Sequence, residues 1–193
     1  MSKENLAAFF YSSNLISLSA AKEIADIFEF RAIGKNDFLL SENKIADKYF
    51  FLDKGYMRAF AIDIDGNEIT TNFYQPGEMI FEVASFFNRS RSKENIQALT
   101  DCEGWYITYK QLNDLFHSLA EFREFGRAML VKGFLELKNR MLSTITETAE
   151  KRYTILLSTN PELFQHVTLK NIATYLGITD SSLSRIRASM LKK

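Results

Sequence analysis

A hairpin signal limits the possible folds of this chain more than any other feature. In residues 56–74, YMRAFAIDIDGNEITTNFY, apolar and polar side chains alternate on both sides of Asp65-Gly66-Asn67. Alternation with a period of two is typical of a strand with one buried face, and Asp-Gly between two such runs favours a tight turn. The sequence therefore predicts an antiparallel hairpin here.

The period of two extends over a longer segment, Arg31–Tyr109. Gly55 and Pro76-Gly77 mark turns on either side of the hairpin. Residues 97–109, QALTDCEGWYITY, predict a further short strand pair that turns at Glu103-Gly104. Many short strands with few helices between them indicate a sandwich or a barrel.

Helical spacing is found on both sides of this strand block. In residues 15–30, Ile24, Ile27 and Phe28 share one helical face, and Ser19 can cap the helix. From about Lys110 to Thr148 there is no proline and the period is again 3.6, which predicts a long helix.

The long helix carries two apolar stripes. The first stripe is Leu119, Phe122, Gly126, Met129 and Gly133, and the second is Leu130, Phe134, Leu137, Met141 and Ile145. One stripe can pack on the chain's own strands and the other on a second subunit, and glycines at heptad spacing allow a second helix to approach closely. The periodicity equally allows a helix that lies wholly on its own domain.

The segment NIATYLGITDSSLSRIR, residues 171–187, has the pattern of two short helices joined by a tight turn. Thr168 can cap the first helix, Gly177 supplies the positive φ needed to leave it, and Thr179 can cap the second. The side chains expected to face the core are Leu169, Ile172, Ala173, Leu176, Ile178, Leu183, Ile186 and Met190. This arrangement predicts a helix-turn-helix whose recognition helix is Asp180–Met190.

The opposite face of the second helix carries Ser181, Ser184, Arg185 and Ala188. Such a face can approach base edges, where Arg185 could pair with guanine through two hydrogen bonds and the serines could reach bases or phosphates. Asp180 would either repel phosphate or accept a hydrogen bond from a cytosine amino group. An ordinary pair of packed helices is the alternative interpretation.

The distribution of charge favours the first interpretation. The whole chain has a formal net charge of zero, but residues 151–193 hold seven Lys or Arg against Glu162 and Asp180, a net charge of +5 that leaves −5 in residues 1–150. A basic segment attracts phosphate, and an acidic body reduces adhesion of the rest of the molecule to nucleic acid. Chance variation of charge in a short window is the alternative.

The composition argues against several other classes of protein. The single Cys102 allows no internal disulfide and no cluster held by four thiolates of one chain. Because there is no P-loop, dinucleotide-binding glycine pattern, catalytic triad or metal-ligand cluster, we expect no enzyme, no metal and no cofactor. The isolated His117 and His166 are more typical of structural or surface residues than of haem ligands. No apolar run approaches the roughly 20 residues that span a bilayer, and Leu6–Tyr11 is too short for a signal peptide, so we expect a cytoplasmic protein without membrane contact.

The order of a strand block, a long helix and a helix-turn-helix resembles the Crp/Fnr family of bacterial transcription regulators. Residues 49–80, YFFLDKGYMRAFAIDIDGNEITTNFYQPGEMI, are similar to the strand, glycine, hairpin and Pro-Gly-Glu run of cyclic-nucleotide-binding domains. Residues 169–187, LKNIATYLGITDSSLSRIR, look like the family's DNA-reading segment in the forms common in Bacteroidetes. The resemblance implies an α+β fold with a jelly-roll-like β-roll as sensor in residues 1–115, a dimerisation helix in residues 116–148 and a helix-turn-helix DNA-binding domain in residues 149–193.

The chain departs from the family in its phosphate-binding cassette, FEVASFFNRSRSKENIQA, residues 81–98. Members that bind cyclic AMP carry Gly-Glu-Leu and, further on, an Arg-Ser pair that holds the cyclic phosphate. Here Glu82 keeps the acid, but Phe81 stands at the glycine and Ser92-Lys93 at the Arg-Ser pair. The resemblance therefore implies that cyclic AMP is not the effector, and the candidate effector-binding residues are Glu82, Arg89, Arg91, Ser92 and Lys93.

The resemblance also implies residues that contact DNA and a set of partners. The candidate DNA contacts are Thr168, Lys170, Thr179, Asp180, Ser181, Ser184, Arg185 and Arg187, with Lys192 and Lys193 available for phosphate. The expected partners are double-stranded DNA, a second copy of the chain in a homodimer, a small-molecule effector and RNA polymerase. The alternative function is a small-molecule-binding or scaffolding protein whose C-terminal helices contact other proteins.

Two further departures concern the backbone. Asn36 and Asn43 stand where the family usually has glycine, and because asparagine tolerates left-handed backbone we expect the fold to survive both. Six residues follow Arg187, too few for the β-wing that many members carry, so we expect no wing here.

Overall fold

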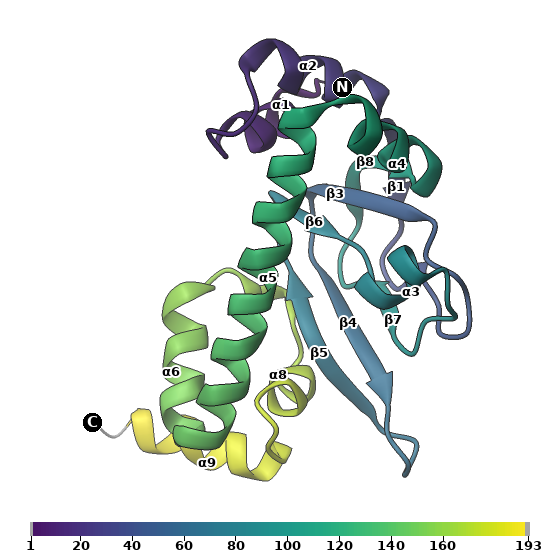
Figure 1. Ribbon diagram of the computed structural model, residues 1–193. Helices are drawn as coiled ribbons and strands as arrows, with labels where there is room; N and C mark the ends of the chain where they lie inside the picture. The colour runs from purple at the N-terminus through teal and green to yellow at the C-terminus, as the bar shows by residue number, and fades with distance from the viewer. Residues whose placement is uncertain (1, 192–193) are drawn as a thin grey trace.

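The computed structural model describes residues 2–191. Figure 1 shows a roll of short strands with two small helices at its N-terminal end, a long helix along one side and a group of helices towards the C-terminus. The predicted α+β fold class, with a β-roll, a long helix and a helical C-terminal part, is confirmed.

Within residues 2–191, the strands form two antiparallel sheets of four strands each. One sheet has the order β1 (Glu29–Ile33), β8 (Cys102–Thr108), β3 (Lys48–Lys54) and β6 (Glu78–Ile80). The other has the order β2 (Phe38–Leu40), β7 (Asn95–Ala98), β4 (Met57–Ile62) and β5 (Glu68–Tyr74). The core between them includes Phe50, Leu52, Met57, Ala59, Ile80, Ile96 and Ile107.

The predicted hairpin is present as β4 and β5. The two strands pair on both sides of Gly66, whose φ of 81° favours glycine. The register shifts between Ala59 and Phe60, so Thr71 is the extra residue of a β-bulge on β5. The left-handed backbone expected at Asn36 and Asn43 is also found, with φ of 71° and 65°.

The prediction for residues 97–109 is wrong. β7 ends at Ala98, β8 runs without a turn through Glu103 and Gly104, and the two strands lie in different sheets. Gly104 serves close packing instead, because a Cβ there would lie only 2.2 Å from the carbonyl oxygen of Phe51.

Two helices cover the N-terminal end of the roll, where the sequence predicted one. They are α1 (Glu4–Tyr11) and α2 (Leu18–Ile27). Ser17 caps α2 by accepting a hydrogen bond from a backbone N–H of the first turn, so the cap predicted at Ser19 is wrong. Ile27, predicted on the buried face, is 37% exposed because it is the last residue of the helix.

The helical segment after β8 is broken once. α4 (Tyr109–Ser118) begins with a capping box and ends before Leu119, whose backbone is extended with φ −121° and ψ 110°. α5 (Ala120–Thr146) follows, so the single long helix predicted from about Lys110 to Thr148 is two helices. Residues 116–118, predicted as the start of the dimerisation helix, belong to α4.

The first apolar stripe of α5 packs against the chain itself. Phe122 is buried and Met129 partly buried in the core of the roll. A Cβ on Gly126 would lie 2.3 Å from a ring carbon of Phe116 in α4, so this glycine makes room for the chain's own side chain and not, as predicted, for a second helix. Gly133 has no other atom within 4 Å of the Cβ position.

The helices that follow α5 form a second core. They are α6 (Ala149–Thr159), α7 (Leu163–His166), α8 (Leu169–Tyr175) and α9 (Asp180–Met190). The predicted caps at Thr168 and Thr179 and the positive φ at Gly177, 68°, are confirmed. Leu169, predicted to face the core, is 39% exposed because it is the first residue of α8. Figure 1 places α9 at the end of the molecule away from α1 and α2.

Candidate nucleic-acid interface and sensor groove

The outer face of α9 is open to solvent. Leu183 is 1% exposed and anchors the helix in the second core. The exposed candidates for DNA contact on α8 and α9 are Lys170, Asp180, Ser181, Ser184, Arg185 and Arg187. Lys192 and Lys193 lie outside the described residues. The face therefore presents small hydroxyls and the guanidinium of Arg185 at one end of the molecule, whereas Arg187 is exposed about 200° around the helix from Arg185.

The two threonines among the candidates act as helix caps. Thr168 accepts a hydrogen bond from the backbone N–H of Asn171 at 3.2 Å, and Thr179 accepts one from that of Ser182 at 3.3 Å. These bonds satisfy backbone groups that a helix start leaves unpaired and define where α8 and α9 begin.

Among the candidate effector-binding residues, Glu82 starts a helix. Its carboxylate accepts hydrogen bonds from the backbone N–H groups of Ala84 at 3.0 Å and Ser85 at 2.6 Å. It is thereby the N-cap of α3 (Val83–Asn88). Both carboxylate oxygens are engaged within the chain.

The basic and hydroxyl candidates have separate surroundings. Arg89 has a φ of 54° and donates to the backbone carbonyl of Ala46 at 2.8 Å and the carboxylate of Asp47 at 3.0 Å. Ser92 is 2% exposed and bonds within its own turn. Arg91 and Lys93 are exposed. A cavity of about 290 Å³ has Glu82 in its wall but none of the other four candidates.

Aromatic rings surround Phe81, the residue before Glu82. The ring of Phe81 lies 4.7 Å from that of Tyr49 and 5.9 Å and 6.0 Å from those of Phe86 and Phe87, measured between centroids. Burial raises the pKa of the Tyr49 hydroxyl, which keeps this group uncharged. The rings occupy the position at which a glycine would leave the backbone accessible.

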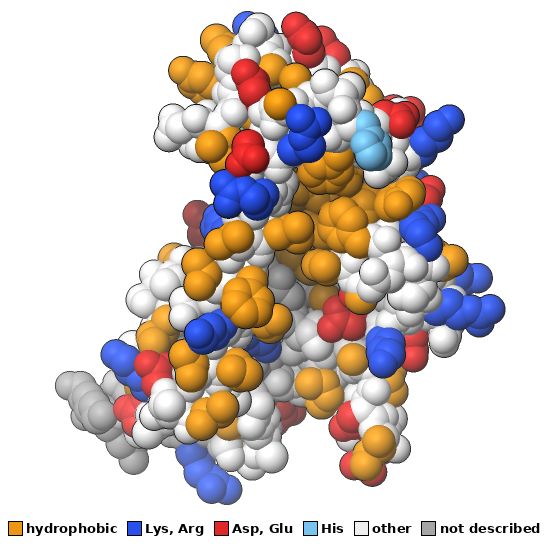
Figure 2. Space-filling view, in the orientation of Figure 1, with side chains coloured by type: hydrophobic (Ala, Val, Ile, Leu, Met, Phe, Trp, Pro, Cys, Tyr) orange, Lys and Arg blue, Asp and Glu red, His pale blue; other side chains and the backbone are white. Residues whose placement is uncertain are grey.

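A hollow of about 660 Å³ lies between α5 and the roll, and Figure 2 shows hydrophobic side chains gathered in it. We call it the apolar groove; its wall includes Phe9, Met79, Phe81, Phe87, Phe116 and Phe134. Glu78 also lies in the wall, and burial raises the pKa of its carboxyl above the ordinary value. The groove can hold an apolar molecule or an apolar helix face.

The second apolar stripe of α5 is exposed along the edge of this groove. Its members, Leu130, Phe134, Leu137, Met141 and Ile145, are 48% to 72% exposed, and we call them the α5 seam. Every residue from Leu130 to Asn139 is exposed. A contiguous apolar strip of this kind marks an interaction site.

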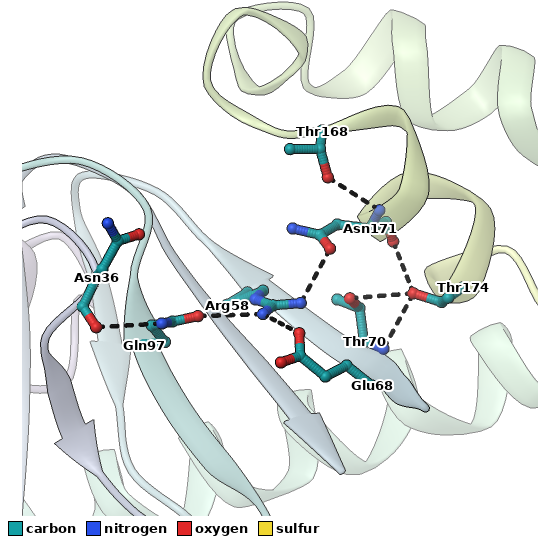
Figure 3. Close-up of polar contacts among 8 residues, drawn as sticks. All are labelled: Asn36, Arg58, Glu68, Thr70, Gln97, Thr168, Asn171 and Thr174. Atoms are coloured by element: carbon teal, nitrogen blue, oxygen red, sulfur yellow. Dashed lines mark hydrogen bonds and ion pairs between the residues drawn. The ribbon is translucent and has the colours of Figure 1, made fainter. Parts of the chain in front are cut away.

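A polar junction between the roll and α8 was not predicted from the sequence. The guanidinium of Arg58 on β4 reaches the side-chain oxygen of Asn171 on α8, as Figure 3 shows. A second contact joins Thr70 on β5 to Thr174 on α8. An arginine within an otherwise buried strand is the one sequence signal that could have indicated this junction.

The remaining candidate groups in the part of the chain that the structure describes are the metal-ligating side chains, the histidines and Cys102. Within residues 2–191, no group of three or more His, Cys, Asp or Glu side chains could hold a metal ion. His166 stacks on Tyr56 with ring centroids 4.4 Å apart. Burial raises the pKa of the Cys102 thiol. Over the same residues, no helix combines the length and the apolar character needed to cross a membrane.

Comparisons with known proteins agree with this architecture. Residues 30–118 match the cyclic nucleotide-binding domain family. The transcriptional activator protein Anr of Pseudomonas protegens is 22% identical over 186 residues, which cover 91% of this chain and 75% of Anr.

Two solved structures have the same fold. FixK2 from Bradyrhizobium japonicum matches with a TM-score of 0.75 at 18% identity, over 86% of this chain and 85% of FixK2. A protein of the Crp/Fnr family from Eubacterium rectale matches with a TM-score of 0.73 at 17% identity, over 95% of this chain and 88% of that protein.

The chain thus joins a cyclic-nucleotide-binding-like roll to a C-terminal helix-turn-helix through one long helix. Its fold is that of the Crp/Fnr family protein from Eubacterium rectale.

Proposed function

We propose that the protein is a dimeric transcription regulator that binds double-stranded DNA through α9 and senses a small molecule other than cyclic AMP, if it senses one at all. Residues 1–115 are the sensor, residues 116–148 the dimerisation segment and residues 149–193 the DNA-binding domain. The observation that carries the proposal is the exposed outer face of α9, where Arg185 stands among serines on a capped and anchored helix. A cytoplasmic location and contact with RNA polymerase accompany this function.

In this proposal α9 enters the major groove. Arg185 forms two hydrogen bonds with a guanine, and the short side chains of Ser181 and Ser184 let the helix approach the bases. Lys170 and Arg187 contact phosphates, which contribute affinity without sequence preference. The hydroxyls of Thr168 and Thr179 hold the ends of the two helices in place.

Dimerisation follows from the α5 seam. Its apolar residues recur at spacings of three and four, which suits packing against the same helix of a second copy. Two-fold symmetry then places the two α9 helices on one face, and such dimers read half-sites about 34 Å apart.

Arg185→Ala is expected to reduce affinity for the specific site about 10- to 100-fold and to relax the preference at one base pair, because one bidentate contact is lost. The test is a binding-site selection with the wild type and the variant, followed by titration of the selected duplex. Identical motifs at equal affinity would contradict the role given to Arg185.

Two control variants distinguish recognition of the base sequence from electrostatic attraction to phosphate. Lys170→Ala is expected to weaken binding to all sequences similarly and to flatten the salt dependence, as loss of a phosphate contact does. Asp180→Ala is expected to lose specificity if the carboxylate accepts from cytosine, and to tighten binding to every sequence if it only repels phosphate.

Cyclic AMP is expected to show no binding at micromolar concentration. The Glu82 carboxylate is engaged at the start of α3, Phe81 fills the glycine position and Arg89 pairs with Asp47. Isothermal calorimetry with the full chain is the measurement. Micromolar affinity that is lost in Glu82→Ala would overturn this part of the proposal.

The salt dependence of binding distinguishes a regulator from a scaffolding protein. A regulator that releases counterions from DNA loses affinity steeply as salt rises, whereas a protein that uses its C-terminal helices for protein contacts shifts no duplex at any salt concentration. An electrophoretic shift assay of a random duplex pool at several salt concentrations separates the two.

A further inference from the structure

The side chain of Arg58 is buried between the roll and the C-terminal helices (Figure 3). The residue is 5% exposed. Its Nη1 donates to the side-chain oxygen of Asn171 on α8 at 2.9 Å. Its Nη2 pairs with the carboxylate of Glu68 and donates to the side-chain oxygen of Gln97 at 3.1 Å. Arg58 is therefore held by three side chains, of which only Asn171 belongs to the DNA-binding domain.

Two more polar contacts cross the same boundary. The backbone N–H of Thr70 donates to the hydroxyl of Thr174 on α8 at 3.2 Å, and the two threonine hydroxyls are also 3.2 Å apart. The hydroxyl of Tyr56 donates to the carboxylate of Glu162, just before α7, at 3.1 Å. Contacts at three separated points define an orientation, whereas a single contact would leave rotation free.

Arg140 on α5 also contacts both the hairpin and α8. Its guanidinium donates to the carbonyl oxygen of Thr71, the residue of the β-bulge, and to that of Tyr175 at 3.2 Å. The guanidinium carbon lies 4.0 Å from the centre of the Tyr175 ring. Arg140 thus joins the long helix, the hairpin and the last turn of α8.

We propose that Arg58 and Arg140 are positioning residues that fix α8, and with it α9, relative to the roll and α5, and so set the distance between the two half-sites that the dimer reads. The proposal rests on the proposed function. The junction contacts α8 and leaves the outer face of α9 exposed, so the orientation that it holds is one in which the reading face is open. If the junction is weakened, α9 still reads each half-site, but the spacing between half-sites is no longer defined.

The test measures spacing preference. Half-sites are first selected from a random duplex pool with the wild-type protein, and duplexes are then made in which the centre-to-centre distance varies in steps of one base pair. We expect the wild type to prefer one spacing at least tenfold over spacings two base pairs away. In Arg58→Met this preference is expected to fall below threefold, while affinity for a single half-site stays within twofold.

Asn171→Ala removes the partner of Arg58 on α8 and leaves the buried arginine in the roll, so it tests the junction even if Arg58→Met does not fold. The matched control is Lys54→Met, which breaks an ion pair of 2.9 Å with Glu103 on the surface of the roll. Lys54→Met is expected to keep the wild-type spacing preference. A loss of folded protein alone would lower binding to all spacings equally and would not change the preference.

Each outcome decides the matter. Wild-type spacing preference in both Arg58→Met and Asn171→Ala overturns the inference and leaves the proposed function intact. Tighter binding by these variants at every spacing also overturns it, because the junction would then hold α9 away from DNA. A wild-type protein that selects no duplex overturns the proposed function itself.

Discussion

Phe134→Asp is expected to convert the protein from a dimer to a monomer at micromolar concentration and to reduce affinity for a two-half-site duplex more than 100-fold. Phe134 lies in the middle of the α5 seam and is 65% exposed in the single chain. In a two-fold dimer each substitution acts twice, and an uncompensated carboxylate buried in an apolar interface costs about 3–5 kcal/mol. Sedimentation velocity and DNA titration are the measurements.

Asn139→Asp is the matched control for this prediction. It places the same carboxylate on the same helix, five residues further on and about 140° around the helix from Phe134, since successive residues are about 100° apart. Asn139 is exposed. The control is expected to remain dimeric. A wild type that is monomeric with and without DNA, or a Phe134→Asp variant that stays dimeric, would contradict the role given to the seam.

Gly104→Ala is expected to destabilise the protein by about 3 kcal/mol, at the upper end of what overpacking of a core costs. The new Cβ would lie 2.2 Å from the carbonyl oxygen of Phe51 and 2.5 Å from a ring carbon of Phe50. The carbonyl belongs to the backbone of β3, which pairs with β8 along its length, so it cannot move without breaking the ladder. Urea unfolding followed by circular dichroism gives the free energy.

Gly177→Ala is the comparison for this second prediction. Gly177 has a φ of 68° but no other atom within 4 Å of the Cβ position, so the substitution brings conformational strain without a clash. The expected loss is about 1–2 kcal/mol, the cost of left-handed backbone for a residue with a side chain. Because Gly104 has no positive φ, a loss no larger than that of Gly177→Ala would show that the close contact with Phe51 is relieved at little cost.

Local patterns predicted the local structure well. The hairpin at Gly66, the caps at Thr168 and Thr179 and the left-handed turns at Asn36 and Asn43 depend on a few neighbouring residues, and the structure has all of them. The exposed outer face of α9 follows from helical spacing in the same way. The contacts proposed for that face remain predictions.

Contacts between distant segments could not be predicted in this way. From the sequence, Gly104 was interpreted as a turn residue, but in the structure it packs against β3. Gly126 was interpreted as a dimer contact, but in the structure it packs against Phe116. Arg58 and Asn171 are 113 positions apart, and no periodic pattern relates them. Such contacts depend on the complete tertiary fold, so a local pattern in one sequence cannot predict them.

The way α5 is held has a mechanical consequence. The helix is fixed in the roll at its start, where Phe122 and Phe125 are buried, and it is surrounded by solvent from Leu130 to Asn139. Its next attachment to the roll is Arg140, which bonds to Thr71 of the hairpin 14 residues after Gly126, about 21 Å along the helix. A rotation of about 5° of α5 at Gly126 would displace the backbone at Arg140 by about 1.8 Å, enough to break a hydrogen bond. Because Arg140 bonds to Thr71 and to Tyr175, such a rotation of α5 would strain its contacts with the hairpin and with α8 together.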